Sequence, residues 1–323
     1  MPGIGITGVR FGCGSSGVGS LTIGVFSDAG HTTPVSSGSY GDTIYLLVTG
    51  TGLTDATWYI NECEVGTGTS YAYNIEWLGT ITIDVVATNG SASATDTATF
   101  DVSEILSDTL ILINEQSTYT LNGTDVSIAE NLGSGVDATQ INVSRQPLYV
   151  ASGINGLPSV DYSGGSADHL FAAGTINAGF STANVIKLSS TGNGSFYLIG
   201  ATYNDGNTYA QICSINGGVF YFNDRQASNQ LTIPITAVNG DEYLIQLVHR
   251  STQIRIRING FDVYVAKSTL SGANLTVGQF IGNGFYGNLN GLMGENVLIN
   301  RIISDQEVLA QEKFLKEKWG LSY

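Results

Sequence analysis

The sequence predicts an all-β protein made of two successive sandwiches, with one helix near the C-terminus. Short apolar segments alternate with polar residues at a period of two, and turn-forming residues separate them about every 8–12 positions, as in sandwiches. Glycine supplies 42 of the 323 residues and charged residues only 12%, which suits short strands joined by tight turns. One stretch near the C-terminus instead has the spacing and the caps of a helix.

The helix is predicted from its two ends. Ser304 and Glu307 form an S-x-x-E capping box, in which each side chain satisfies a backbone N–H of the first turn. The helix should run to about Lys318, and Gly320 stands where a left-handed residue commonly ends a helix.

One face of this helix is expected to be buried. Val308, Leu315 and Trp319 fall close to one line on its surface, whereas Glu312 lies beside that line and makes the amphipathic pattern imperfect. A strand over Leu292–Ile303 precedes the helix, so the pair should close and cap the edge of a sheet.

The N-terminal part of the chain predicts a small sandwich. Residues 1–24 carry eight glycines and are either an arm that lies along another surface or a frayed terminus with a first strand. Residues 25–103 should form the sandwich, with Trp58 anchoring its core. Its strands are expected at Leu21–Phe26, Thr43–Gly50, Thr57–Ile60, Tyr71–Ile75, Trp77–Thr88 and Ala94–Val102.

This first sandwich resembles the Ig-like or PKD-like modules of bacterial and phage proteins. The resemblance rests on Gly41–Thr43, on Trp58 followed by Asn61, and on Gly79–Thr80 leading to the turn at Asn89–Gly90. The Cys…Trp…Cys pattern of antibody domains is absent. The resemblance implies a spacer or an adhesive connector.

Residues 104–109 are predicted to be a linker before a second domain at 110–323. In that domain Gln146–Tyr149, Asn155–Val160 and Asp168–Leu170 follow one another as a Q-P-x-Y turn, an N-G-x-P-S-V strand and a D-x-L strand. Its end carries Gly291, Met293, Glu295, Leu298 and Lys318-Trp319-Gly320. Together these motifs resemble the concanavalin A-like lectin/glucanase (LamG-like) jelly roll, which implies an antiparallel sandwich with one C-terminal helix.

Between these motifs the chain predicts an antiparallel meander. Turns are expected at Asn204–Asn207, Asn216–Gly218 and Asn259–Gly260, because Asn-Gly supplies the positive φ angles of type I′ turns. One strand alternates apolar and basic residues, which predicts one buried and one solvated face. These residues are Ile254, Arg255, Ile256, Arg257 and Ile258.

The charge of the chain argues against nucleic acid as a partner. The formal net charge is −15, and residues 1–103 contain one basic residue, Arg10, against nine acidic ones. No apolar run reaches the length of a membrane span, so no membrane insertion is expected. The N-terminus lacks the charged and apolar regions of a signal peptide, which predicts a protein made and left in a host cytoplasm.

The cysteines are few and odd in number. Cys13, Cys63 and Cys213 show no metal spacing, and free thiols are favoured, although a Cys13–Cys63 bridge stays open. The histidines His31, His169 and His249 are too dispersed to suggest zinc, so no metal site is predicted from them.

A catalytic role is not expected. A glycan hydrolase on this fold would need two converging carboxylates, whereas Asp241 and Glu242 are adjacent and point to opposite faces of a strand. Glu295 stands alone and is expected to be a structural partner near the helix. No Gly-x-Ser-x-Gly elbow or phosphate-binding loop occurs.

The ligand candidates gather around one predicted hairpin. Tyr203, Tyr209 and Tyr221 could form an aromatic platform for a glycan, with polar partners at Asn204, Asp205 and Asn207. The same loop, or Asp161 with Asp168, could offer oxygens to calcium, but each set has too few carboxylates for a tight site. No cofactor is therefore predicted.

The function that the resemblances imply is display without catalysis. A non-enzymatic bacteriophage virion protein is expected, as a capsid-decorating, head-fibre or tail-associated component. It would contact other virion proteins and hold host or mucosal glycans on the virion surface, with its oligomeric state left open. The alternatives are a bacterial surface adhesin or carbohydrate-binding module and, third, a glycan hydrolase.

Overall fold

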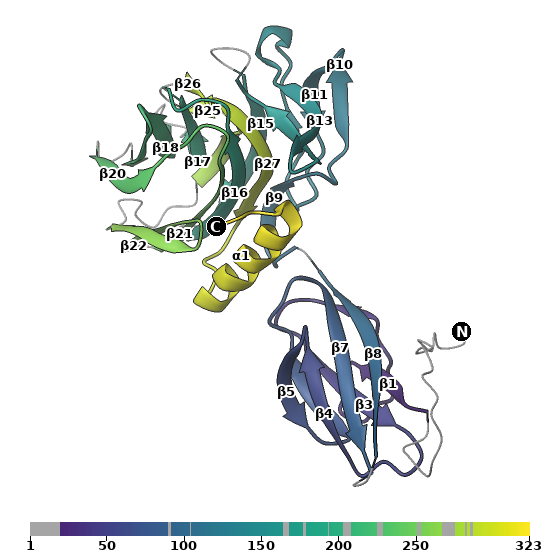
Figure 1. The fold of residues 1–323 in the computed structure, drawn as a ribbon. Coiled ribbons are helices and arrows are strands. Elements are labelled where there is room, and N and C mark those ends of the chain that lie inside the picture. Colours follow the sequence, from purple (N-terminus) through teal and green to yellow (C-terminus); the bar gives the residue numbers. More distant parts are fainter. Residues whose placement is uncertain are drawn as a thin grey trace. The chain divides into compact units, whose positions relative to one another are not determined.

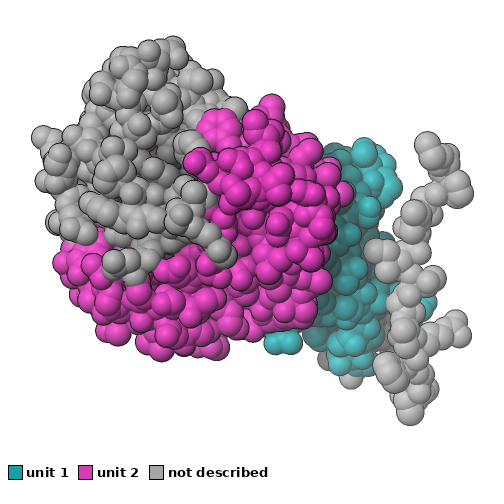
Figure 2. All heavy atoms as spheres, turned by 90° about the horizontal axis from the view of Figure 1, so that it is seen from above, with its two compact units in different colours: residues 1–106 teal, residues 107–323 magenta. Residues whose placement is uncertain are grey.

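The chain folds into two compact units, Met1–Leu106 and Ser107–Tyr323 (Figure 2). The boundary between them falls inside the segment 104–109. The computed structural model describes residues 20–89, 92–103, 105–163, 168–176, 179–192, 194–202, 208–224, 229–250, 253–266, 275–281, 283–284 and 287–323. Within these residues the fold is all-β with one C-terminal α-helix, as the sequence predicted.

Unit 1 is a sandwich of two sheets (Figure 1). In its described residues one sheet has the strand order β1-β3-β6 and the other β2-β8-β7-β4-β5. All neighbouring strands are antiparallel except β2 and β8. The strands are β1 (Thr22–Phe26), β2 (Ser37–Gly38), β3 (Thr43–Thr49), β4 (Asp55–Ile60), β5 (Cys63–Thr67), β6 (Ser70–Asn74), β7 (Gly79–Thr88) and β8 (Ser93–Val102).

The core of unit 1 forms around Trp58, which is fully buried, so its predicted role is confirmed. Its indole Nε1 donates a hydrogen bond of 2.8 Å to the carbonyl oxygen of Gly68, which satisfies the one polar atom of the ring. The end of the predicted arm, Thr22–Gly24, belongs to β1, whereas residues 1–19 lie outside the described part of the chain.

Strand β5 was not predicted, because its turn carries no glycine. Asn61 and Glu62 join β4 to β5, and both have positive φ angles, 46° and 67°. Two successive positive φ angles make a type I′ turn, which the sequence usually signals with Asn-Gly. Cys63, the first residue of β5, is an exposed free cysteine.

Unit 2 is built on a long sheet and a four-stranded meander, β17-β18-β19-β20 (Figure 1). The long sheet has the order β23-β22-β21-β16-β27-β14-β13-β11-β12-β15-β24, with β10 beside β11 and β9 beside β27. A short η1 turn (Val143–Arg145) and the pair β25–β26 complete the described elements. Buried residues of the two sheets, among them Phe180, Leu247, Phe220 and Phe222, share one core.

The strands of unit 2 are β9 (Thr109–Ile113), β10 (Tyr119–Asn122), β11 (Asp125–Ala129), β12 (Ala138–Thr139), β13 (Leu148–Ile154), β14 (Leu157–Asp161), β15 (Leu170–Ile176), β16 (Phe180–Leu188), β17 (Gly194–Thr202), β18 (Thr208–Asn216), β19 (Val219–Asp224), β20 (Asn229–Thr236), β21 (Glu242–Arg250), β22 (Gln253–Ile258), β23 (Phe261–Ala266), β24 (Leu275–Ile281), β25 (Asn283–Gly284), β26 (Gly287–Asn288) and β27 (Gly291–Ile299).

Of the predicted Asn-Gly turns in the described residues, the one at 259–260 forms as expected. At 216–218 the hairpin also forms, but its positive φ angles of 57° and 80° belong to Gly217 and Gly218 and not to Asn216. Asn259 and Gly260 join β22 to β23 with φ angles of 47° and 84°, as a type I′ turn requires. Asn155 and Gly156, which the sequence motif placed in a strand, make the same kind of turn between β13 and β14, and β14 begins only at Leu157. The predicted turn at Asn204–Asn207 lies entirely in residues outside the described ranges.

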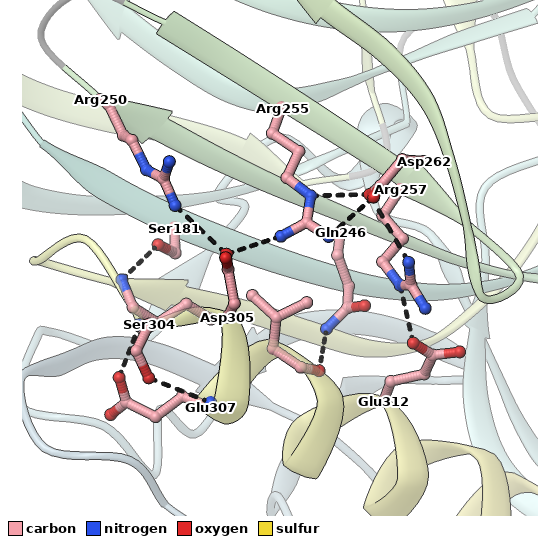
Figure 3. Close-up of polar contacts among 12 residues, drawn as sticks. Ser181, Gln246, Arg250, Arg255, Arg257, Asp262, Ser304, Asp305, Glu307 and Glu312 are labelled. Carbon is pink, nitrogen blue, oxygen red and sulfur yellow. Dashed lines mark hydrogen bonds and ion pairs between the residues drawn. The ribbon is translucent and has the colours of Figure 1, made fainter.

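Helix α1 (Asp305–Trp319) has both predicted caps. The Ser304 side chain accepts from the backbone N–H of Glu307, whose carboxylate accepts from the backbone N–H of Ser304, so the capping box is complete (Figure 3). At the other end Gly320 takes a left-handed φ of 61°. Asn155 Nδ2 donates to the carbonyl oxygen of Trp319, which ties the β13–β14 hairpin to the end of the helix.

The buried face of α1 is more regular than the sequence suggested. Gln311 joins Val308, Leu315 and Trp319 in a continuous stripe, and its amide oxygen accepts from Gln246 of β21. The Trp319 ring packs so closely on β27 that a Cβ at Gly294 would stand 2.5 Å from it. Position 294 therefore has to be glycine, since the fully buried ring cannot move aside.

Ion pairs fix α1 to strands β22 and β23. Figure 3 shows Arg255 between Asp262 of β23 and Asp305 of α1, at 2.7 and 2.8 Å. Arg257 reaches Glu312 of α1 at 2.7 Å. Glu312, the polar residue that interrupts the amphipathic pattern of the helix, is thus the partner of Arg257. The face of β22 that carries Arg255 and Arg257 was predicted to be solvated, but it lies under the helix.

Removing Arg257 should loosen α1 more than removing Arg250. The Arg257–Glu312 side chains are 14% and 13% exposed, whereas Arg250 and its partner Asp305 are 39% and 70% exposed. Arg257→Ala leaves a half-buried carboxylate unpaired and should lower the opening free energy of α1 by about 1–3 kcal/mol. Arg250→Ala, the matched control, should cost below about 1 kcal/mol. Hydrogen exchange of the α1 amides measures both, and equal losses would contradict the burial argument.

Candidate functional site

The predicted glycan platform is described in part. Tyr203, Asn204, Asp205 and Asn207 lie outside the described residues, so only the strand positions of Tyr209 and Tyr221 can be placed. Tyr209 lies in β18 opposite Ala201 of β17. Tyr221 lies in β19 opposite Ser214 of β18, five residues further along that strand, which separates the two positions by about 17 Å.

Tyr221 remains as a surface feature of the meander. It is half-buried and stands between Phe220 and Phe222, which are buried in the core, so it points to the outer face of the sheet. Its cross-strand neighbours are Ser214 on one side and the exposed Thr232 on the other. An aromatic ring beside an exposed threonine is a chemistry that can stack on a sugar and hydrogen-bond to it.

The two carboxylates of the second calcium pair have different surroundings. Asp161 Oδ1 accepts from both the backbone N–H and the hydroxyl of Ser163, at 2.8 and 2.5 Å, so it stabilises the turn that follows β14. Asp168 is buried, with 5% exposure. Across the described ranges no group of three or more His, Cys, Asp or Glu side chains could hold a metal ion.

The three histidines have separate surroundings. His31 stacks edge-on against Phe26 in unit 1, and His249 lies parallel to the Phe180 ring at 4.7 Å in the core of unit 2. The His169 ring lies 2.9 Å from the Gln140 amide nitrogen.

Glu295 is a deeply buried carboxylate of unit 2 whose pKa is raised. It is 2% exposed, at the point where β27 passes under the end of α1. Its Oε2 accepts from the Trp319 indole at 2.8 Å and lies 3.2 Å from Lys318 Nζ. The structure therefore places Glu295 as a partner of the helix, as the sequence predicted.

Two further residues complete this group, and sequence reasoning missed both. Asn114, 1% exposed, donates from Nδ2 to Glu295 Oε1 at 3.5 Å, and Glu115 Oε2 lies 3.1 Å from Lys318 Nζ. Both follow β9, which pairs with β27, and Asn114 thereby meets Glu295 across 181 residues of sequence. We call Asn114, Glu115, Glu295 and Lys318 the helix-end cluster.

The environment of the helix-end cluster raises the pKa of Glu295 towards neutrality. Burial raises the pKa of this carboxyl from 4.5 to about 7, against the opposing influence of Lys318 and the Trp319 indole, while the nearby Glu115 raises it further. A carboxyl that exchanges its proton near neutral pH, beside an amine and an amide, can act as a proton shuttle.

No protein-family model and no curated protein sequence matches the chain. Among solved structures, a Trypanosoma rangeli sialidase with sialic acid is similar over 88% of this chain and 50% of its own, at 10% identity and a TM-score of 0.46. This chain thus spans about half the length of that sialidase.

Two smaller structures are also similar. Domain 4 of AbnA, a GH43 extracellular arabinanase from Geobacillus stearothermophilus, in complex with arabinotriose, matches 64% of this chain and 98% of its own, at 12% identity and a TM-score of 0.44. A SAP-like pentraxin from Limulus polyphemus matches 44% of this chain and 75% of its own, at 14% identity and a TM-score of 0.36. Among the described residues no helix is long and apolar enough to cross a membrane.

Titration of Glu295 should give unit 2 a distinctive pH dependence. Because its folded pKa of about 7 lies above the ordinary 4.5, the folded state binds the extra proton in that interval, and stability falls as pH rises through it. Glu295→Gln should remove this downward slope, whatever its effect on absolute stability. Glu317→Gln, an exposed change in the same helix, should keep the wild-type slope. Urea unfolding from pH 4.5 to 7 measures the slopes, and identical slopes in wild type and Glu295→Gln would contradict the assignment.

Proposed function

We propose that this chain is a non-enzymatic display protein whose second unit binds surface glycans weakly. The observation that carries the proposal is Tyr221, a half-buried ring on the outer face of the meander beside the exposed Thr232. A tyrosine in this setting offers a flat apolar face with polar neighbours at a low cost in conformational entropy.

The surroundings of the described carboxylates favour binding over hydrolysis. Hydrolysis needs an acid and a second carboxylate on either side of an accessible glycosidic bond. Glu295 and Glu115 lie instead on either side of Lys318 Nζ, under the end of α1, and Glu312 pairs with Arg257 beneath the same helix. The ion pairs of these three carboxylates support a structural role for them.

The finer proposal is a bacteriophage virion protein, as a capsid-decorating, head-fibre or tail-associated component. The order of an Ig-like spacer followed by a lectin-like sandwich supports it, as does the glycine-rich segment at residues 1–24, which could dock on a particle. Many copies on one particle would turn weak sites into useful avidity, by roughly 10²–10⁴ for linked sites.

Replacing Tyr221 should weaken glycan binding without unfolding the chain. Tyr221→Ala removes the stacking face and should lower affinity for the best ligand on an array of bacterial and mucosal glycans by at least about tenfold, or 1.4 kcal/mol. Tyr59→Ala is the matched control, because Tyr59 is a half-buried outward tyrosine in β4 of unit 1. Binding that is equally strong in both variants, or absent in the wild type, would remove this site.

The virion assignment predicts that the protein co-purifies with intact phage particles. Density-gradient fractions probed with an antibody should contain the full chain at a fixed ratio to the major capsid protein. A chain that lacks residues 1–19 should lose this incorporation if the segment docks, while its β1 strand stays intact. Recovery of the wild-type protein on bacterial cell surfaces instead of particles would support an adhesin and overturn the assignment.

A further inference from the structure

The helix-end cluster places an amine, an amide and a proton carrier together in the interior of unit 2. Lys318 Nζ lies 3.2 Å from Oε2 of Glu295, and the Asn114 side-chain nitrogen lies 3.5 Å from Oε1 of the same carboxyl. Glu295 therefore bridges the other two groups. The Lys318 side chain is 9% exposed and Asn114 is 1% exposed, so bulk water has little access.

We propose that Lys318 and Asn114 react to form an intramolecular amide, which links the end of helix α1 covalently to the turn after β9. The amine of Lys318 is the nucleophile, the side-chain carbonyl carbon of Asn114 is the electrophile, and Glu295 carries the protons between them. The product is an Nζ–Cγ amide bond and one molecule of ammonia.

The step balances in atoms and charge. Glu295 takes a proton from the Lys318 ammonium, and the freed lone pair of Nζ attacks Cγ of Asn114, which moves the carbonyl electrons onto Oδ1. Glu295 then gives its proton to Nδ2, the Cγ–Nδ2 bond breaks as the carbonyl re-forms, and ammonia leaves. The remaining extra proton on Nζ passes through Glu295 to the ammonia, which departs as ammonium.

The surrounding contacts suit each role. The backbone N–H of Gln116 donates to Asn114 Oδ1 at 2.9 Å, which polarises the carbonyl and stabilises the oxyanion that forms there. The Trp319 indole holds Glu295 in place through its Oε2. Burial, which raises the pKa of Glu295 to about 7, eases the transfer of a proton from the amine to the carboxyl.

The Asn114 backbone is also fixed before any reaction. Its carbonyl oxygen accepts from the Tyr119 hydroxyl at 2.9 Å, and its N–H donates to the Ser117 hydroxyl at 3.2 Å. Lys318 and Asn114 each contact one oxygen of the same Glu295 carboxyl. Groups oriented for reaction within one molecule reach effective molarities of up to about 10⁵–10⁸ M, and the proposed amide exchange draws on this effect.

Glu115 is the competing acceptor, because its Oε2 is 3.1 Å from Lys318 Nζ. Condensation there would have to expel an oxygen from a carboxylate, which is a poor electrophile because it is negatively charged. The neutral amide of Asn114, with a donor on its oxygen and a shuttle at its nitrogen, is the better electrophile.

Intact mass spectrometry of the purified full chain tests the proposal directly. The wild-type protein should be lighter than its sequence mass by one ammonia, about 17 Da. Trypsin should no longer cleave after Lys318, and fragmentation should join Lys318 to Asn114. Lys318→Ala, Asn114→Ala and Glu295→Gln should each have the full mass of their own sequences, whereas Lys313→Ala, at an exposed lysine of the same helix, should keep the loss.

The wild-type mass decides the matter even if a variant fails to fold. A wild-type chain with its full sequence mass would overturn the proposal. A loss of one water, about 18 Da, with a link from Lys318 to Glu115 would also overturn it, because Asn114 would then not be the acceptor.

Discussion

The seating of helix α1 on the long sheet is the constraint on which the rest of unit 2 depends. The sheet face that meets α1 carries Gln246 of β21, with the buried apolar residues Leu244 and Val248 two positions before and after it on the same face. Full burial of each such side chain contributes roughly 1.5–3 kcal/mol relative to exposure. Without the helix this face would be open to water, and the sheet would have one covered face instead of two (Figure 1).

Polar contacts hold the two ends of α1 in different ways. At the start, Glu307 completes the capping box and also pairs with Arg301, so one carboxylate caps the helix and anchors the chain before it. At the end, the helix-end cluster and the side-chain amide of Asn155 hold the last turn of the helix against the sheet. The apolar stripe supplies the affinity of the helix for the sheet, and these groups set its position and register.

Helix caps and turns, which depend on residues close together in the sequence, could be predicted, whereas contacts between residues far apart in the sequence could not. The capping box, Gly320 and the Asn-Gly turn at 259–260 depend on neighbours within a few residues, and each formed as predicted. Asn114 depends on Glu295, which is 181 residues away, and Tyr209 and Tyr221 are separated by a strand register that no local pattern encodes. Strand β5 was not predicted because the pair Asn61-Glu62 adopts the turn that Asn-Gly usually makes.

The uneven placement of basic residues has a consequence for survival outside a cell. Between Arg10 and Arg145 the sequence contains no lysine or arginine, a span that covers all of the described part of unit 1 and the passage into unit 2. Proteases of the trypsin type cut the chain only after a lysine or an arginine. The sandwich nearest the N-terminus, and its attachment to the second, therefore offer such enzymes no bond to cut, whether folded or unfolded.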